Sequence, residues 1–308
     1  MRVRREFLLF GLLAAVALAG GWWLLSQRPG AAVDAYRKEA VAGAAKSRPA
    51  PISADTFRAT MCGAGRCVLV EAGGLAFLFG AGEGTAAGLA RLSLLRADMD
   101  LVLMPEADLR SAGGLPGLAR AAKAAGRTDA LKINGPQGIV AVVDGANLLA
   151  SADAAVRMTV VPDGENQGLA GRIVFDSGVV VIRTFEGADA KGRLYRIDFD
   201  GTSLILAGCR AGAETILTAA RGTQKVAGVL ASGSLTLAPA ETGCPDVAGI
   251  LKAAGQGKLA ATIIVPESAV DARDAWVELV ASDPSANAKV SAAGMQIDLT
   301  SERPQIRN

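Results

Sequence analysis

From Thr56 onward the sequence alternates between strand-like and helix-like segments without a long interruption. The stretch 99–104, MDLVLM, has the apolar character of a buried strand, and 114–127 after it has helical spacing. Such alternation favours sheets on the inside and helices on the outside. Because 51% of the residues are apolar and only 4% aromatic, the core must consist mainly of Ala, Val, Leu and Ile. The sequence therefore predicts one α/β domain over 53–302, near the upper size limit of a single core.

Local turn signals divide this domain into elements. Gly73 and Gly74 separate two short apolar runs, which predicts a β-hairpin. Pro116 lies near the start of a predicted helix, where its missing N–H is not needed. The stretch 289–299, KVSAAGMQIDL, predicts a final strand, and 303–308 is left as a tail.

The N-terminal region has a different character. Phe7–Leu25 carries no charged side chain, and as a helix it would be about 28 Å long, close to the hydrocarbon thickness of a bilayer. Arg2, Arg4 and Arg5 precede it, which predicts a cytoplasmic N-terminus and a single membrane-spanning helix. We therefore expect an inner-membrane protein whose main domain lies in the periplasm or another extracytoplasmic compartment.

Two other interpretations of this segment stay open. Small residues around Ala19 allow a cleaved signal peptide, although the apolar run continues beyond them. A buried helix of a soluble domain is the third interpretation. The predicted divisions of the chain are an anchor at 1–26, a spacer at 27–52, the domain at 53–302 and the tail at 303–308.

The charge balance gives no sign of a nucleic-acid partner. The chain has 32 Lys and Arg against 30 Asp and Glu, a net charge of +2. Proteins that bind phosphate backbones usually have a concentrated basic face, and no basic run occurs beyond the first five residues. We expect a membrane contact through Phe7–Leu25 and an unspecified protein or small-molecule partner.

Export would place the four cysteines in an oxidising compartment, where disulfides form. Four cysteines permit three sets of pairs, and the short spacing of Cys62 and Cys67 allows these two to close a small loop. The alternative is a zinc site built from all four, which include Cys209 and Cys244. Its usual paired C-x-x-C spacing is absent.

Several longer stretches carry a resemblance to one family. They are VEAGGLAFLFGAGEGT at 70–85, GGLPGLARAAKAAGRTDALKINGPQG at 113–138, and LYRIDFDGTSLILAG at 194–208. Over residues 61–299 the chain resembles the metallo-β-lactamase superfamily, nearest its ribonuclease Z-like branch. The resemblance implies a four-layer αββα sandwich, preceded here by the predicted transmembrane helix.

The resemblance also implies a site with two zinc ions, held by a His-x-His-x-Asp-His motif, by later histidines and by an aspartate. Imidazole nitrogen suits zinc, and two metals generate hydroxide and hold the leaving oxygen. This chain, however, contains no histidine. The positions matched to the family's site are Glu106, Asp108, Arg110, Ser111, Glu186, Cys209, Arg210 and Glu267.

We therefore predict that the chain holds no metal or other cofactor, although the family would use two zinc ions. The hypothesis is that the guanidiniums of Arg110 and Arg210 stand in for the zinc ions and pair with carboxylates. The carboxylates concerned are Glu106, Asp108, Glu186 and Glu267. The predicted function is a non-catalytic binding or scaffold protein, a pseudoenzyme. The alternative is a hydrolase of a phosphate ester or other small substrate, with an unconventional carboxylate and cysteine site.

Two further uses of these positions stay open. Glu106, Asp108 and Glu267 could offer oxygen ligands to Ca²⁺, Mg²⁺ or Mn²⁺, although the charge of Arg110 opposes a cation. Cys209 could act as a nucleophile, although no histidine is present to activate it.

Phosphate binding is another possibility. The loop Gly80–Thr85, GAGEGT, is rich in glycine but lacks the Lys-Ser/Thr ending of a P-loop, so a structural turn is favoured. Arg110 and Arg210 could still bind an acidic small molecule in the emptied cleft.

Overall fold

The computed structural model describes residues 49–308 apart from the gaps 64–66, 151–153, 188, 222, 224, 234–243, 245–246, 258, 267–287, 301–303 and 308. Residues from Pro49 to Asn308 belong to one compact unit. The predicted anchor Phe7–Leu25 lies outside the described residues. Of the helices within them, none combines the length and the apolar character needed to cross a membrane.

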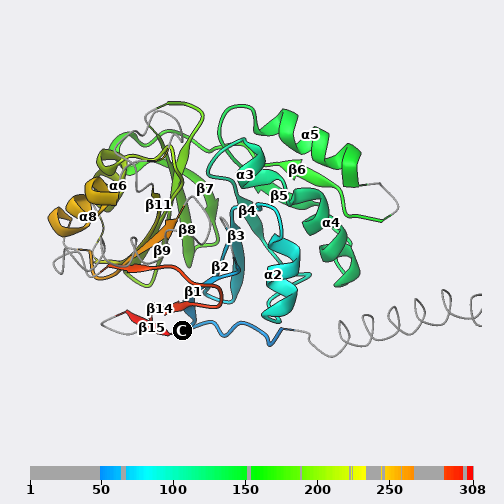
Figure 1. Ribbon diagram of the computed structural model, residues 1–308, viewed down its shortest axis with the longest axis horizontal. Coiled ribbons are helices and arrows are strands. Elements are labelled where there is room, and N and C mark those ends of the chain that lie inside the picture. The colour runs from blue at the N-terminus through cyan, green and yellow to red at the C-terminus, as the bar shows by residue number, and fades with distance from the viewer. Residues whose placement is uncertain are drawn as a thin grey trace, which may run out of the picture. The chain divides into compact units, whose positions relative to one another are not determined.

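Two β-sheets stack on each other (Figure 1). The first contains β1 (Phe57–Met61), β2 (Val68–Ala72), β3 (Leu75–Phe79), β4 (Leu101–Leu103), β5 (Leu131–Asn134), β6 (Met158–Val160), β14 (Gln296–Asp298) and β15 (Gln305–Arg307). The second contains β7 (Arg172–Asp176), β8 (Val180–Glu186), β9 (Arg193–Phe199), β10 (Thr202–Ala207), β11 (Lys225–Gly233), β12 (Thr262–Pro266) and β13 (Ala288–Val290). Their strand orders are β15-β14-β1-β2-β3-β4-β5-β6 and β13-β12-β11-β10-β9-β8-β7.

Helices cover the outer face of each sheet, which confirms the predicted αββα layering. The first sheet is covered by α2 (Thr85–Arg91), α3 (Leu109–Ala112), α4 (Leu115–Ala124) and α5 (Ile139–Ala150). The second is covered by α6 (Ala213–Ala220) and α8 (Val247–Gln256), and a short 3-10 helix, η1 (Gly168–Ala170), precedes β7. The two helical groups lie on opposite sides in Figure 1.

The side chains of each strand alternate between two apolar layers. Val70 and Phe77 face the second sheet, where they join the core between the sheets. Leu69 and Leu78 point the other way and pack under the helices. Each large side chain buried in this way contributes about 1.5–3 kcal/mol. Strands buried on both faces explain the continuous apolar runs in the sequence.

Two local predictions are confirmed. Gly73 and Gly74 form the turn between β2 and β3, and both have positive φ angles, 58° and 84°. A side chain on Gly73 would also press against the ring of Phe199. Pro116 occupies the first turn of α4, as its fixed φ favours.

Two predictions about the C-terminal region are wrong. The stretch 289–299 is not one strand, because β13 ends at Val290 in the second sheet and β14 begins at Gln296 in the first. A turn at Gly294, with φ 84°, carries the chain between them, and Gly294 donates its N–H to the Met61 carbonyl. The predicted tail contains β15, which pairs with β14, so the domain extends beyond residue 302.

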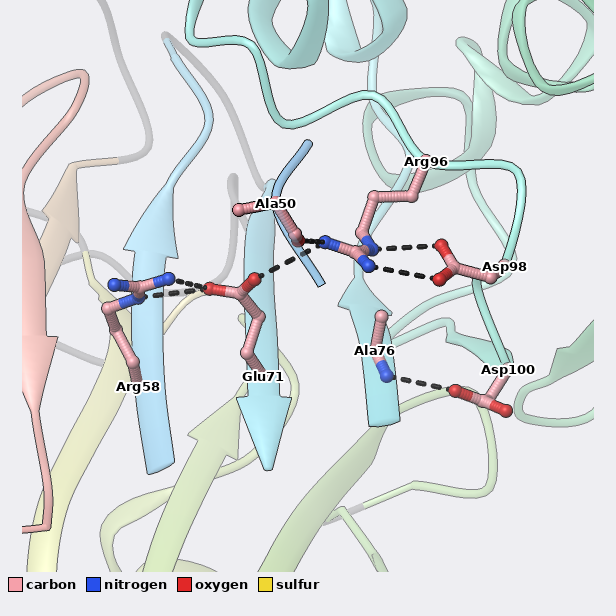
Figure 2. A network of polar contacts seen from close by, with 7 residues as sticks. All are labelled: Ala50, Arg58, Glu71, Ala76, Arg96, Asp98 and Asp100. Atoms are coloured by element: carbon pink, nitrogen blue, oxygen red, sulfur yellow. Dashed lines mark hydrogen bonds and ion pairs between the residues drawn. The ribbon is translucent and has the colours of Figure 1, made fainter. Parts of the chain in front are cut away.

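A buried ion-pair network lies on the helix side of the first sheet (Figure 2). Glu71 is only 3% exposed, and its carboxylate lies 2.9 Å from Arg58 Nε and 3.7 Å from an Arg96 nitrogen. Arg96 also donates to the carbonyl of Ala50 at 3.0 Å and makes two hydrogen bonds to Asp98. The last residues of the predicted spacer are therefore part of the folded unit.

Candidate functional site

Several of the described positions matched to the family's site follow strands that end at one edge of the sandwich. Glu106 follows β4, Glu186 ends β8, and Cys209 and Arg210 follow β10. The two halves of the chain are bonded to each other at this edge. Arg193 donates its N–H to the Pro105 carbonyl at 2.8 Å, and Glu106 forms an isolated β-bridge with Gly192.

Glu106 lies at the centre of this edge and is only 1% exposed. One carboxylate oxygen accepts a hydrogen bond of 2.9 Å from the Ser111 hydroxyl, which is fully buried. The other accepts the backbone N–H of Arg210 at 3.1 Å. Hydrogen bonds to both oxygens are what a buried carboxylate requires, because an unsatisfied one is costly to desolvate.

Asp108 and Arg110 are placed by the short helix α3. Asp108 is its N-cap, and its Oδ1 accepts the Ser111 N–H at 2.8 Å. Aspartate is favoured at this position because it satisfies a backbone donor that has no partner in the helix. Arg110 is exposed on the helix. The polar cluster in the sequence is therefore, in part, a helix start.

Arg210 points its guanidinium to a partner that the sequence did not indicate. Its Nη1 lies 2.6 Å from Asp189 Oδ2, in the loop between β8 and β9. Side chains cannot be added around this residue, because a Cβ on Gly187 or Gly192 would overlap Arg210. A Cβ on Gly208 would overlap the carboxylate of Glu106. The edge is therefore closely packed.

Glu186 lies away from this packing. Its side chain is 57% exposed and its carboxylate is 3.5 Å from the guanidinium of Arg172. Both residues line a surface cavity of about 310 Å³ that also reaches Glu214 at the start of α6. Another surface cavity, of about 450 Å³, lies at the opposite ends of the strands, beside Asp200 and Asp298.

For Arg210 the predicted arginine–carboxylate pairing is therefore wrong in its partner, whereas the pairing predicted for Arg110 stays a prediction. Arg210 binds Asp189 through its guanidinium and reaches Glu106 through its backbone, while Glu186 binds Arg172. The Glu106 carboxylate instead accepts hydrogen bonds from the Ser111 hydroxyl and the Arg210 backbone N–H. Glu267 lies outside the described residues.

Sequence reasoning missed a second buried polar group at this edge. Asn134, which ends β5, donates to Asp163 at 3.0 Å, and Arg193 binds the other oxygen of Asp163 at 2.5 Å. The Tyr195 hydroxyl lies 2.9 Å from Asn134 Oδ1 and 3.1 Å from the Met104 carbonyl oxygen. Burial raises the pKa of Tyr195, so it stays a neutral donor. One signal was available, since Asn134 ends a strand parallel to β4, and such strand ends meet at one edge.

No protein-family model matches the chain, and no curated protein matches it. Solved structures do. The metallo-β-lactamase fold protein YhfI from Bacillus subtilis is 11% identical, with a TM-score of 0.61 over 79% of this chain and 98% of that one. The chain has the metallo-β-lactamase fold. The human short form of tRNase Z, ELAC1, is 13% identical, with a TM-score of 0.58 over 79% and 99% of the two chains. Zn²⁺-bound PqqB from Methylobacterium extorquens is 12% identical, with a TM-score of 0.54 over 79% and 100%.

The two zinc ions that the metallo-β-lactamase fold implies do not fit the residues at this edge. Zinc sites use imidazole nitrogen, thiolate or carboxylate ligands directed at a shared space. Here there is no imidazole, and the carboxylate of Glu106 points at Ser111 and the Arg210 backbone. Among the described residues, no three His, Cys, Asp or Glu side chains are grouped so that they could hold a metal.

The four cysteines form disulfides and are therefore not free to bind zinc. The structure pairs Cys62 with Cys67 and Cys209 with Cys244. A site of four zinc-binding cysteines and a nucleophilic Cys209 both need free thiols, so these two alternatives are wrong. The second disulfide ties the loop after β10 to the segment before α8.

Two further alternatives lose their support. An oxygen-ligand site for Ca²⁺, Mg²⁺ or Mn²⁺ needed Asp108, which is used as a helix N-cap, and Glu106, which faces Ser111. The loop Gly80–Thr85 forms the turn that leads into α2. Its Ala81 carbonyl accepts the N–H of Gly114 at 2.7 Å, and the Thr85 hydroxyl donates to the Gly82 carbonyl at 2.7 Å. This is the structural turn that the sequence favoured.

Proposed function

We propose that this protein is a non-catalytic binding or scaffold module built on the metallo-β-lactamase fold. The observation that carries the proposal is the state of Glu106, which replaces the first histidine of the family's motif. Its carboxylate is buried and held by groups from both halves of the chain. A carboxylate that is buried and hydrogen-bonded in this way is directed at the protein's own groups rather than at a metal ion or a substrate.

Elemental analysis tests this proposal. The full-length protein is purified without chelator and without added metal, and its zinc content is measured beside hydrolysis of bis(p-nitrophenyl) phosphate. We expect substoichiometric zinc and no hydrolysis above the buffer rate. Zn²⁺-bound PqqB, purified in the same way, serves as the positive control for metal retention. Stoichiometric zinc together with turnover would refute the proposal.

We further propose that the module is held at the outer face of the inner membrane by a single N-terminal helix. The uncharged run Phe7–Leu25, preceded by three arginines, supports the anchor and its orientation. Two disulfides in the folded unit support export, since disulfides persist mainly in oxidising compartments.

Fractionation tests this placement. We expect the full-length protein to stay with membranes at alkaline pH, to be cleaved by protease added from the periplasmic side, and to show no free thiols after denaturation. A deletion of residues 1–26 is the matched control and should remain in the soluble cytoplasmic fraction with reactive thiols. Recovery of the full-length protein in the cytoplasm with four free thiols would contradict the proposal.

A further inference from the structure

The helices α3 and α5 expose several large apolar side chains on the outside of the first sheet's helical layer. The large apolar side chains exposed there are Leu109 at 82%, Val140 at 57%, Leu148 at 86% and Leu149 at 73%. We name the exposed side chains of α3, α4 and α5 the α3–α5 face. Large exposed apolar patches mark sites of interaction rather than ordinary surface.

Helical geometry shows where this face is most prominent. α5 buries Ile139, Val143, Ala146 and Ala150 against the first sheet. At about 100° per residue, Leu148 lies almost directly opposite that buried stripe. Leu149 and Val140 flank it, so the last turn of α5 presents a leucine pair to the outside. The two cavities described above are lined by other elements.

The same face carries exposed cationic side chains. Arg110 on α3, and Arg120 and Lys123 on α4, are all exposed, and α4 packs beside α5. The three helices contain a single acidic residue, Asp144. The starts of α3 and α5 lie close together, because Ala107 just before α3 is next to Gly138 just before α5. Apolar side chains beside cations are the combination that binds an anionic lipid surface.

The chain enters the folded unit on the face of the first sheet that its helices cover. Ile52 packs into the apolar layer beneath the helices of the first sheet, and the Ala50 carbonyl is held by Arg96. Residues 26–48, between the proposed anchor and this point, could span up to about 75 Å if extended. The proposed anchor therefore leaves the α3–α5 face within reach of the bilayer.

We propose that the α3–α5 face rests on the anionic phospholipid surface of the membrane that holds the N-terminal helix. This inference rests on the proposed function. A second copy of the chain fits less well, because a two-fold axis along α5 would bring two Asp144 carboxylates together. A peptide would need a groove, whereas the leucine pair projects outward.

Lipid photocrosslinking tests this inference on the full-length chain. The protein is reconstituted into nanodiscs of phosphatidylcholine with or without phosphatidylglycerol, each containing a phospholipid with a photoactivatable acyl chain. Labelled peptides are then identified by mass spectrometry. We expect labelling of Phe7–Leu25 in both discs, and labelling of 139–150 that is at least about threefold higher with phosphatidylglycerol, as attraction to anionic lipid predicts.

Variants separate the apolar and the charged parts of the face. Leu148→Ser with Leu149→Ser should abolish labelling of α5, whereas Leu169→Ser, at an equally exposed leucine on η1, should leave it unchanged. Arg120→Ser with Lys123→Ser should remove the dependence on phosphatidylglycerol. All these side chains are exposed, so each variant should keep the parent's melting temperature.

The outcomes distinguish this inference from the proposed function. Labelling of Phe7–Leu25 without labelling of α5 would overturn the inference and leave the anchor intact, and a protein partner would then have to cover this face. Absence of both labels would refute the anchor itself. Equal labelling of α5 in the Leu148→Ser, Leu149→Ser variant would also overturn the inference.

Discussion

Glu71 and Glu106 are both almost fully buried, but their carboxylates are held in different ways. Glu71 lies between two guanidiniums, those of Arg58 and Arg96, within the first sheet and its covering loop. Glu106 accepts a hydroxyl from Ser111 and a backbone N–H from Arg210, more than 100 residues later in the sequence. The first joins neighbouring segments, whereas the second joins the two halves of the fold.

The difference between these two sites shows where an arginine side chain can pair with a buried carboxylate. A guanidinium needs room for its long side chain, and Arg58 has that room because it is 38% exposed. At the edge near Glu106, glycines at 187, 192 and 208 bring backbones together and leave no such space. A hydroxyl group and one backbone N–H, both of which need little room, hold the Glu106 carboxylate there. The edge is built for close packing, in agreement with a module that does not need an open cleft.

The largest effect should come from Glu71→Ala. It leaves the buried guanidinium of Arg96 without one of its carboxylates, and breaking a buried pair from one side costs about 3 kcal/mol. For a domain of this size the melting temperature should fall by about 6–10 °C. Glu186→Ala, which breaks an exposed pair, is the control and should cost less than about 1 kcal/mol. Equal costs would remove the distinction between the two kinds of pair.

Gly208→Ala should have the next largest effect. The added methyl group would overlap the Glu106 carboxylate and Pro105, and overpacking of this kind costs about 1–3 kcal/mol. Chemical denaturation of the single and double variants measures the coupling free energy between positions 208 and 106. Gly208→Ala should cost less in a Glu106→Ala background. Strict additivity would mean that Glu106 does not fill the edge as described.

Glu106→Gln should have a smaller effect than Glu71→Gln. The amide keeps an oxygen for the Arg210 N–H, and the Ser111 hydroxyl can rotate to accept from the new NH₂ group, so the expected cost is about 1 kcal/mol. Glu71→Gln instead removes a negative charge between two guanidiniums. If denaturation shows Glu106→Gln to be the costlier variant, charge rather than hydrogen bonding holds Glu106.

The smallest effects should be seen in the pH dependence of two neighbouring aspartates. Hydrogen bonds from Arg96 lower the pKa of Asp98, so its stabilising effect is complete above about pH 4 and is lost as the pH falls through the lowered folded-state value. Burial raises the pKa of Asp100, so its ionised form destabilises the fold at neutral pH, and acid relieves this cost.

Melting temperatures of two variants across the acid range check these opposite signs. Asp98→Asn should melt below the parent at neutral pH and should converge with it once the pH falls below the lowered folded-state pKa of Asp98, where the aspartate is protonated in both the folded and the unfolded protein. Asp100→Asn should melt at or above the parent at neutral pH and converge on acidification. Parallel curves for the two variants would contradict the assigned causes of the shifts.

The strands and helices that the sequence predicted best are those whose signals are local. The glycine pair at 73 and 74 fixed a hairpin, and Pro116 marked a helix start, because each acts on its own backbone. The region 289–299 was predicted badly, because neither β13 nor β14 is stable by itself, and each is defined by the strand beside which it lies.

The predictions about the candidate site divide in the same way, into those that depend on composition and those that depend on contacts between distant segments. Absence of histidine is a property of composition, so the mismatch with a zinc site could be predicted without coordinates. The pairing of Arg210 with Asp189, and of Asp163 with Arg193, could not, because these partners lie in loops whose approach depends on both sheets.

The sequence by itself determined the layered α/β architecture, the loss of imidazole ligands and the apolar N-terminal run, because apolar periodicity and composition are carried by the residues alone. Only the tertiary structure decided which donors hold Glu106, which cysteines are joined, and that leucines of α3 and α5 stay exposed. Those facts depend on contacts between segments far apart in the chain, and such contacts exist only once the two sheets have packed together.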